Sequence, residues 1–101
     1  MSLVLLVAAA ALPPAYRGVW ASEPGDCAQP SSAFRVAVTA TRFRDARVVR
    51  VDRQRGSLLV SLRIPGGAIV ERQLLLADRG RTLRVVEELG IMNYQKCESA
   101  R

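Results

Sequence analysis

Two cysteines are the residues of this chain best suited to carry chemistry. Cys27 and Cys97 are the only cysteines among its 101 residues, and they lie about 70 residues apart. The chain contains no histidine, which excludes the usual general base at neutral pH, Ser-His and Cys-His nucleophile pairs, and most zinc and copper sites. Cysteines so far apart form no Cys-x-x-Cys redox motif, and without further ligands they hold no metal. We therefore predict a disulfide between Cys27 and Cys97, with an intermolecular bridge or two free thiols as the alternatives.

The small size of the chain makes such a bridge valuable. A chain of 101 residues holds one domain at most, and a domain this small is marginally stable without a staple. Closing a loop of about 70 residues removes roughly 4 kcal/mol of unfolded-state entropy in the simple chain model. That gain is large beside a total stability of about 5 kcal/mol.

The carboxylates provide little support for catalysis. The chain has nine acidic residues, and the adjacent Glu87 and Glu88 point to opposite faces if they lie in a strand. No glycine-rich phosphate loop or nucleotide fingerprint is present. We expect no enzymatic activity, no metal and no cofactor, and a small hydrolase built on carboxylates is the least supported function that we retain.

The basic residues are almost all arginine. Lys96 is the single lysine among 15 basic residues, and the net charge is +6. A cluster of arginines falls within one short segment: Arg42, Arg44, Arg47, Arg50, Arg53 and Arg55. Such a cluster is a candidate binding edge for lipid phosphates, lipopolysaccharide, acidic glycans or an acidic protein surface. The alternatives are a solvated face that protects an edge strand from pairing with other chains, and an arginine bias of the genome.

The first residues are typical of a secretory leader. Leu3 to Leu12 is an uninterrupted apolar run of ten residues, far short of the roughly 20 residues of a membrane-spanning helix. Pro13-Pro14 follows, and Val19-Trp20-Ala21 places small or aliphatic residues where a signal peptidase requires them, so we predict cleavage before Ser22. No basic residue precedes the apolar run. An uncleaved membrane-surface anchor or a different start codon is therefore the alternative.

This leader predicts the organisation and the location of the protein. We expect a signal peptide over 1–21, an extended lead-in rich in Pro, Gly and Ser over 22–33, and a single β-rich domain over 34–101. The expected location is secreted or periplasmic. Nucleic acid is not an expected partner, because this compartment lacks it and few aromatic residues lie among the arginines.

Short apolar runs separated by turn residues predict the fold. Residues 57–64 (SLLVSLRI) are the clearest strand, because the apolar side chains alternate with Ser57, Ser61 and Arg63. Ile64-Pro65-Gly66-Gly67 is typical of a type II turn. Further strands are expected over 34–41, 46–52, 68–77 and 81–89, although the last two segments are also compatible with helices. The prediction is a mainly β domain, an antiparallel meander of five or six strands in a barrel or sandwich, with a short C-terminal helix as a variant and the terminal disulfide.

Adjacent apolar pairs within these runs suggest a second covered face. Neighbouring residues of a strand point to opposite faces, so one core cannot bury Leu58 and Leu59 together, or Val85 and Val86. Bulges or helices realign some pairs, or the second face meets a partner. On the partner interpretation, we expect the contact residues to be Leu59, Leu75 and Val86.

These observations favour a small, exported, non-enzymatic binding or accessory domain of the cell envelope that acts through protein contact. The partner would be an unidentified envelope protein or a second copy of the chain. The alternative is binding of a polyanion, such as a lipid phosphate or lipopolysaccharide, through the arginine-rich edge.

Overall fold

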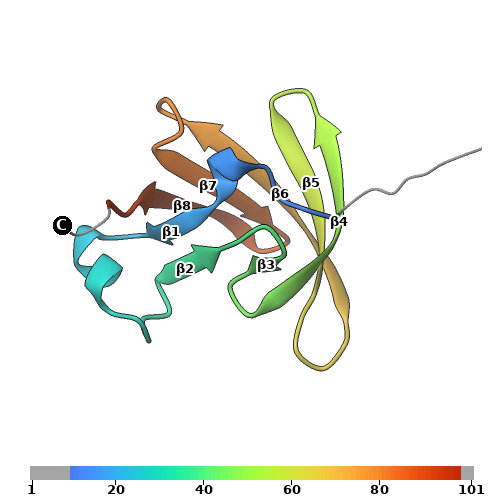
Figure 1. Ribbon diagram of the computed structural model, residues 1–101, viewed down its shortest axis with the longest axis horizontal. Helices are drawn as coiled ribbons and strands as arrows, with labels where there is room; N and C mark the ends of the chain where they lie inside the picture. The colour runs from blue at the N-terminus through green and yellow to red at the C-terminus, as the bar shows by residue number, and fades with distance from the viewer. Residues whose placement is uncertain (1–9, 99–101) are drawn as a thin grey trace, which may run out of the picture.

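The computed structural model describes residues 10–98, which form a closed barrel of antiparallel strands (Figure 1). The mainly β fold is confirmed, and of the two expected architectures the barrel is the one observed. Eight strands are present in the described range, two or three more than predicted: β1 Gly18–Ala21, β2 Arg35–Val38, β3 Arg42–Phe43, β4 Ala46–Gln54, β5 Ser57–Arg63, β6 Ile69–Ala77, β7 Thr82–Glu87 and β8 Gly90–Lys96. Two short 3-10 helices complete the structure, η1 Pro14–Tyr16 and η2 Pro24–Ala28.

The strands follow each other around the barrel in sequence order, and β1 closes it by pairing with both β2 and β8. The hairpins from β4 to β8 contain long ladders, of seven residue pairs between β4 and β5 and six between β5 and β6. The turn between β5 and β6 forms as predicted, with Gly66 at a φ of 99° and the Gly67 N–H donating to the Ile64 carbonyl at 2.9 Å.

The two segments that also suited helices are strands. Residues 68–77 contain β6 and residues 81–89 contain β7, and the part of the chain from 10 to 98 includes no α-helix. The variant with a C-terminal helix is therefore wrong: the last described element is β8, which pairs with β7 over six residue pairs. Tertiary pairing outweighs the local helix propensity of the leucine and glutamate residues.

Alternating side chains fill the interior of the barrel. Every described strand contributes to one cluster of buried residues, which includes Val36, Val60, Leu74 and Val85, each at most 1% exposed. Small barrels of this kind are packed with side chains rather than hollow. The adjacent apolar pairs are explained by this geometry, since one member of each pair points inward and the other outward.

Residues 12–21 belong to the barrel, which places the start of the domain well before residue 34. Leu12 and Trp20 are both fully buried, and β1 supplies the strand between β2 and β8. Cleavage before Ser22 would remove this strand and open the barrel. The segment 22–33 is not simply an extended lead-in either, because it contains η2.

Most of the apolar run predicted as a leader lies outside the described residues, in 1–9. In the described range, no helix has the length and apolar character needed to cross a bilayer.

Candidate functional site

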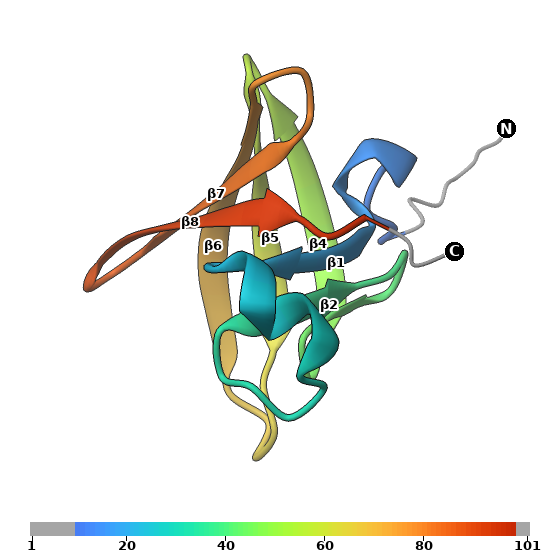
Figure 2. The same ribbon diagram turned by 90° about the vertical axis from the view of Figure 1, so that its left-hand side faces the viewer.

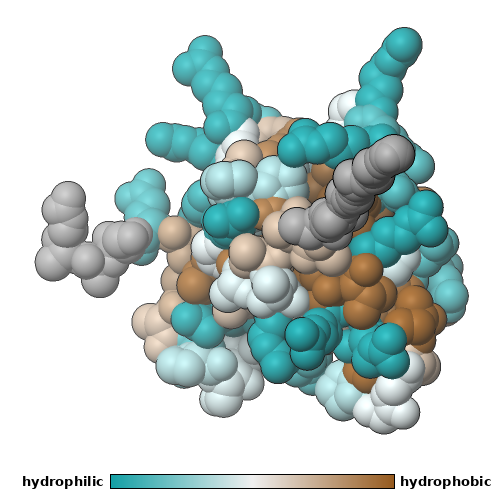
Figure 3. Space-filling model, turned by 45° about the vertical axis from the view of Figure 1, so that its right-hand side comes forward, coloured by the Kyte–Doolittle hydropathy of each residue, from teal (hydrophilic) through white to brown (hydrophobic). Residues whose placement is uncertain are grey.

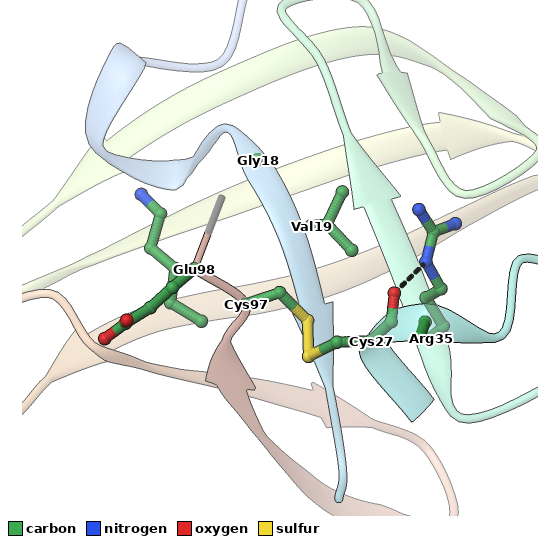
Figure 4. Close-up of a pocket in the computed structure, with 8 residues that line it drawn as sticks. Gly18, Val19, Cys27, Arg35, Cys97 and Glu98 are labelled. Atoms are coloured by element: carbon green, nitrogen blue, oxygen red, sulfur yellow. Dashed lines mark hydrogen bonds between the residues drawn. A yellow bond between two sulfur atoms is a disulfide. The ribbon is translucent and has the colours of Figure 1, made fainter. Parts of the chain in front are cut away.

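The disulfide between Cys27 and Cys97 is confirmed (Figure 4). It joins η2, which follows β1 in the chain, to the residue directly after β8, and the two Cα atoms lie 5.7 Å apart. The backbone N–H of Cys97 also donates to the Val19 carbonyl at 2.8 Å, which extends the β1–β8 contact past the last paired strand residues. The bridge therefore fastens the seam at which the barrel closes, and it indicates an oxidising compartment.

An open pocket of about 470 Å³ surrounds this bridge (Figure 4). Its basic side chains are already engaged. Arg35 Nε donates to the Cys27 carbonyl at 3.3 Å, and Lys96 Nζ lies 5.2 Å from the centre of the Trp20 ring, within range of a cation–π contact. The carboxylate of Glu98 is a further lining group. These contacts hold the seam together, and the pocket presents no unpaired cationic pair to a ligand.

The structure brings together only part of the predicted arginine cluster. Arg47 lies directly opposite Arg42 on one side and directly opposite Arg63 on the other. Residues directly opposite each other in antiparallel strands point to the same face, so Arg42, Arg47 and Arg63 form a row across β3, β4 and β5, which we call the arginine ladder. All three are exposed. Opposed like charges destabilise a sheet, and neither ion pair found among residues 10–98 involves this ladder.

The other predicted arginines have separate surroundings. Arg44 occupies the β3–β4 turn with a φ of 60° and donates from Nη1 to the Ala33 carbonyl at 3.1 Å. Arg50 is paired with Asp52 at 3.0 Å. Arg55 is exposed at the β4–β5 turn. Sequence spacing therefore predicted more arginines in the cluster than the structure brings together, and it missed Arg63. The alternation of residues 57–64 did place Arg63 on the polar face of its strand.

Arg53 lies at one end of the barrel, near Tyr16. Arg53 lies directly opposite the buried Leu58, so both residues belong to the inner face of the sheet. Because Arg53 is close to the end of β4, its side chain is nevertheless exposed. Burial raises the pKa of the Tyr16 hydroxyl, and the positive charge of Arg53 partly opposes this effect. The arrangement keeps Tyr16 neutral as a packing residue beside the core.

The three predicted contact residues lie on the outer face of neighbouring strands. Gln73 of β6 lies directly opposite Leu59 of β5 and Val86 of β7, and Leu75 is two residues further along β6. All three apolar side chains are partly exposed. Ile91 of β8 extends the same row because it lies opposite Val86, and it is 57% exposed. The sequence indicated the three residues but not Ile91, since β8 was not predicted.

An open groove of about 620 Å³ runs along this outer face. Four of its lining residues are apolar and three are glutamates. The lining residues are Leu59, Ile69, Val70, Glu71, Gln73, Val86, Glu87 and Glu88. We call this surface the outer groove. A concentration of three glutamates is notable in a chain with a net charge of +6.

The tip of the β7–β8 hairpin continues the outer groove. The hairpin extends away from the body of the barrel (Figure 2). Leu89 at its turn is 99% exposed, and Ile69, which lines the groove, is 50% exposed. Elsewhere too, hydrophobic side chains emerge between long hydrophilic ones, as one side of the molecule shows (Figure 3). Large apolar side chains that are this exposed and clustered are typical of interaction surfaces.

The glutamates of the outer groove do not resemble a hydrolytic pair. Glu71 and Glu88 are exposed, and Glu87 lies 3.9 Å from the Arg72 guanidinium. A carboxylic general acid requires an apolar surrounding that keeps it protonated. Among residues 10–98, no three His, Cys, Asp or Glu side chains lie close enough together to hold a metal ion.

Comparison of the chain with protein-family models, with curated proteins and with solved structures finds no match.

Proposed function

We propose that this chain is an exported, non-enzymatic binding domain that docks on a partner protein through the outer groove and the β7–β8 hairpin tip. The exposed hairpin tip is the observation that carries the proposal. Leu89 and Ile91 are 99% and 57% exposed, and Ile91 lies opposite Val86, which lines the groove. Exposed apolar side chains that gather on one face are typical of interaction surfaces.

The charged residues of the outer groove indicate the chemistry of the partner. Glu71 and Glu88 are exposed and line the groove together with its apolar residues, so the surface suits an apolar segment flanked by Lys or Arg side chains. Charges at the rim speed encounter and select the partner, while apolar anchors at the centre supply most of the affinity. The disulfide supports a location in an oxidising compartment, such as the periplasm or the extracellular space.

A capture experiment with matched variants tests this proposal. Immobilised wild-type protein is incubated with envelope extract beside the Leu89→Ser/Ile91→Ser variant and the Phe34→Ser control, which removes another apolar side chain that is 55% exposed. We expect one protein to be retained by the wild type and the control, with at least a tenfold weaker affinity for the double variant, because exposed apolar anchors contribute about 1.4 kcal/mol or more. Equal retention by all three proteins, or retention of none, would contradict docking through this surface.

The arginine ladder favours a second candidate function, binding of an anionic envelope component. Three guanidinium groups in one row, with no described carboxylate paired to them, form a bidentate-capable surface for phosphate. Binding should be electrostatic and should therefore weaken steeply as salt screens it.

Vesicles that contain phosphatidylglycerol test this second function. We expect cosedimentation of the wild type at low salt, loss of binding at high salt, and loss of binding in the Arg47→Gln/Arg63→Gln variant. The Arg55→Gln/Arg79→Gln variant removes the same charge from two exposed turns and should bind as the wild type does. If both variants bind equally, net charge explains the binding and the ladder is not a site.

A further inference from the structure

We propose that two copies of this chain form a dimer by pairing the open edges of their β8 strands, antiparallel and around a twofold axis at Met92. The occupant of this edge is therefore a second copy of the chain. The inference goes beyond docking through the outer groove and does not depend on it.

The part of β8 near the hairpin turn has a strand neighbour on one side only. β7 pairs with β8 from Gly90 to Gln95, whereas β1 pairs with it only at Gln95 and Lys96. The chain that follows β1 turns back, because the disulfide ties η2 to the residue after the other end of β8. The hairpin extends past β1 (Figure 2), and in the part of the chain that the structure describes no strand pairs with this edge of β8 from 90 to 94.

The alternation of the backbone shows which groups this edge presents. The N–H of Lys96 donates to the Arg81 carbonyl, on the β7 side, at 2.8 Å. Successive residues of a strand direct their N–H and C=O groups to opposite sides, so Ile91 and Asn93 direct theirs away from β7. Among residues 10–98, no backbone hydrogen bond reaches these groups. The edge is a template for a further strand.

The side chains of this edge do not protect it from pairing. β4 also extends past its neighbour, since β3 pairs only with its first two residues, but the remainder of β4 carries Arg50, Asp52 and Arg53. Charged side chains on an exposed edge discourage pairing with another chain. From Gly90 to Tyr94, by contrast, β8 has no charged side chain. Of these two edges, the β8 edge is therefore the one suited to an added strand.

A second copy of β8 is complementary to this edge in one register. With the axis at Met92, Ile91 of each copy lies opposite Asn93 of the other, and each such pair exchanges two hydrogen bonds, so both residues satisfy all their outward groups. A shift of two residues sets Asn93 opposite Leu89 in the turn, or Ile91 opposite Gln95, where β1 already pairs. The two Met92 side chains meet at the axis, and each is 38% exposed in the single chain.

The charges at the two ends of the hairpin favour the same alignment. In this register the turn of one copy, which carries Glu88, approaches the end of β8 in the second copy, where Lys96 is exposed. The twofold axis repeats this contact at both ends, and opposite charges on neighbouring strands stabilise their pairing. Because the pairing occupies the open β8 edge of both copies, the assembly closes at two chains and does not grow into a fibre.

Sedimentation equilibrium with charge-swapped variants tests the dimer and its register. We expect the wild type to dimerise as its concentration rises from micromolar to millimolar. Met92→Lys and Met92→Glu should each dimerise about tenfold more weakly or worse, because like charges then face each other at the axis, and an equal mixture of the two should recover the dimer. The control Ile69→Lys places the same charge on a groove side chain that is 50% exposed and should dimerise as the wild type does.

Hydrogen exchange of the wild type, resolved by residue with NMR, identifies the edge without any substitution, so it stands even if a Met92 variant fails to fold. The amides of Ile91 and Asn93 should gain protection as the dimer forms, while that of Met92, which faces β7, is protected throughout.

A wild type that stays monomeric over this range would overturn the proposal, as would a mixture of the Met92 variants that stays monomeric. Loss of the dimer in Ile69→Lys would assign self-association to the outer groove. Protection of Ile91 and Asn93 only after envelope extract is added would assign the edge to a strand of another protein. Failure of docking changes capture from the extract and leaves the dimer intact, so the two proposals fail separately.

Discussion

Trp20 connects the core, the N-terminal segment and the barrel seam through one side chain. The indole is fully buried, and its N–H donates to the Tyr16 carbonyl at 3.0 Å. Trp20 is paired with Val36 of β2 and with Lys96 of β8, and Lys96 Nζ lies 5.2 Å from the ring centre. A large apolar body with one polar handle suits a position where the core meets a strand end.

The substitution Trp20→Phe should destabilise the protein by about 2 kcal/mol, because it leaves a cavity and removes the partner of the Tyr16 carbonyl. The free energy of unfolding is measured by urea denaturation followed by far-UV circular dichroism. Tryptophan fluorescence cannot be used, because Trp20 is the only tryptophan and the variant lacks it. The control Phe34→Leu alters a side chain that is 55% exposed and should stay within about 0.5 kcal/mol of the wild type. A Trp20→Phe protein as stable as this control would show that the indole does not anchor the seam.

The strands divide into those that local pattern predicts and those that it does not. Residues 57–64 alternate clearly and end at a Pro-Gly turn, so β5 and its hairpin with β6 were predictable. β1 is four residues long, and β3 is two. Segments this short show no measurable period, and only long-range pairing stabilises them. The sequence Val19-Trp20-Ala21 therefore suggested a cleavage motif instead of a strand.

The candidate surfaces show the same limit. Leu59, Leu75 and Val86 were predictable because the strand period places one member of each apolar pair outside. The arginine ladder was not, since it depends on the register that sets Arg47 opposite Arg63. A bulge between Val48 and Arg50 shifts this register and sets Arg50 opposite Ser61, on the same face as Arg47, where Asp52 pairs with it. Register between strands is a property of the folded sheet, and no spacing along one strand contains it.

At the scale of the whole molecule, the barrel is strongly paired on one side and weakly paired on the other. The ladder between β4 and β5 has seven residue pairs, the one between β5 and β6 has six, and the one between β6 and β7 has five. β1 and β8 share two pairs, and β2 and β3 share one. The disulfide lies on the weak side, where it links the ends that flank the seam. One covalent bond thus compensates for the hydrogen bonds that the short strands cannot supply.

The double substitution Cys27→Ser/Cys97→Ser should therefore open the barrel at the β1–β8 seam before it unfolds elsewhere. We expect a loss of up to about 4 kcal/mol in the free energy of unfolding, since the bridge closes a loop with a sequence separation of 70. Hydrogen exchange resolves where the loss falls. The amides of β1 and the amide of residue 97, which donates to Val19, should exchange faster than those of β5 and β6, because local opening follows the weakest pairing. Reduction of the wild type should reproduce this pattern, and an equal loss of protection in β1 and β5 would show that the bridge stabilises the whole barrel and not its seam.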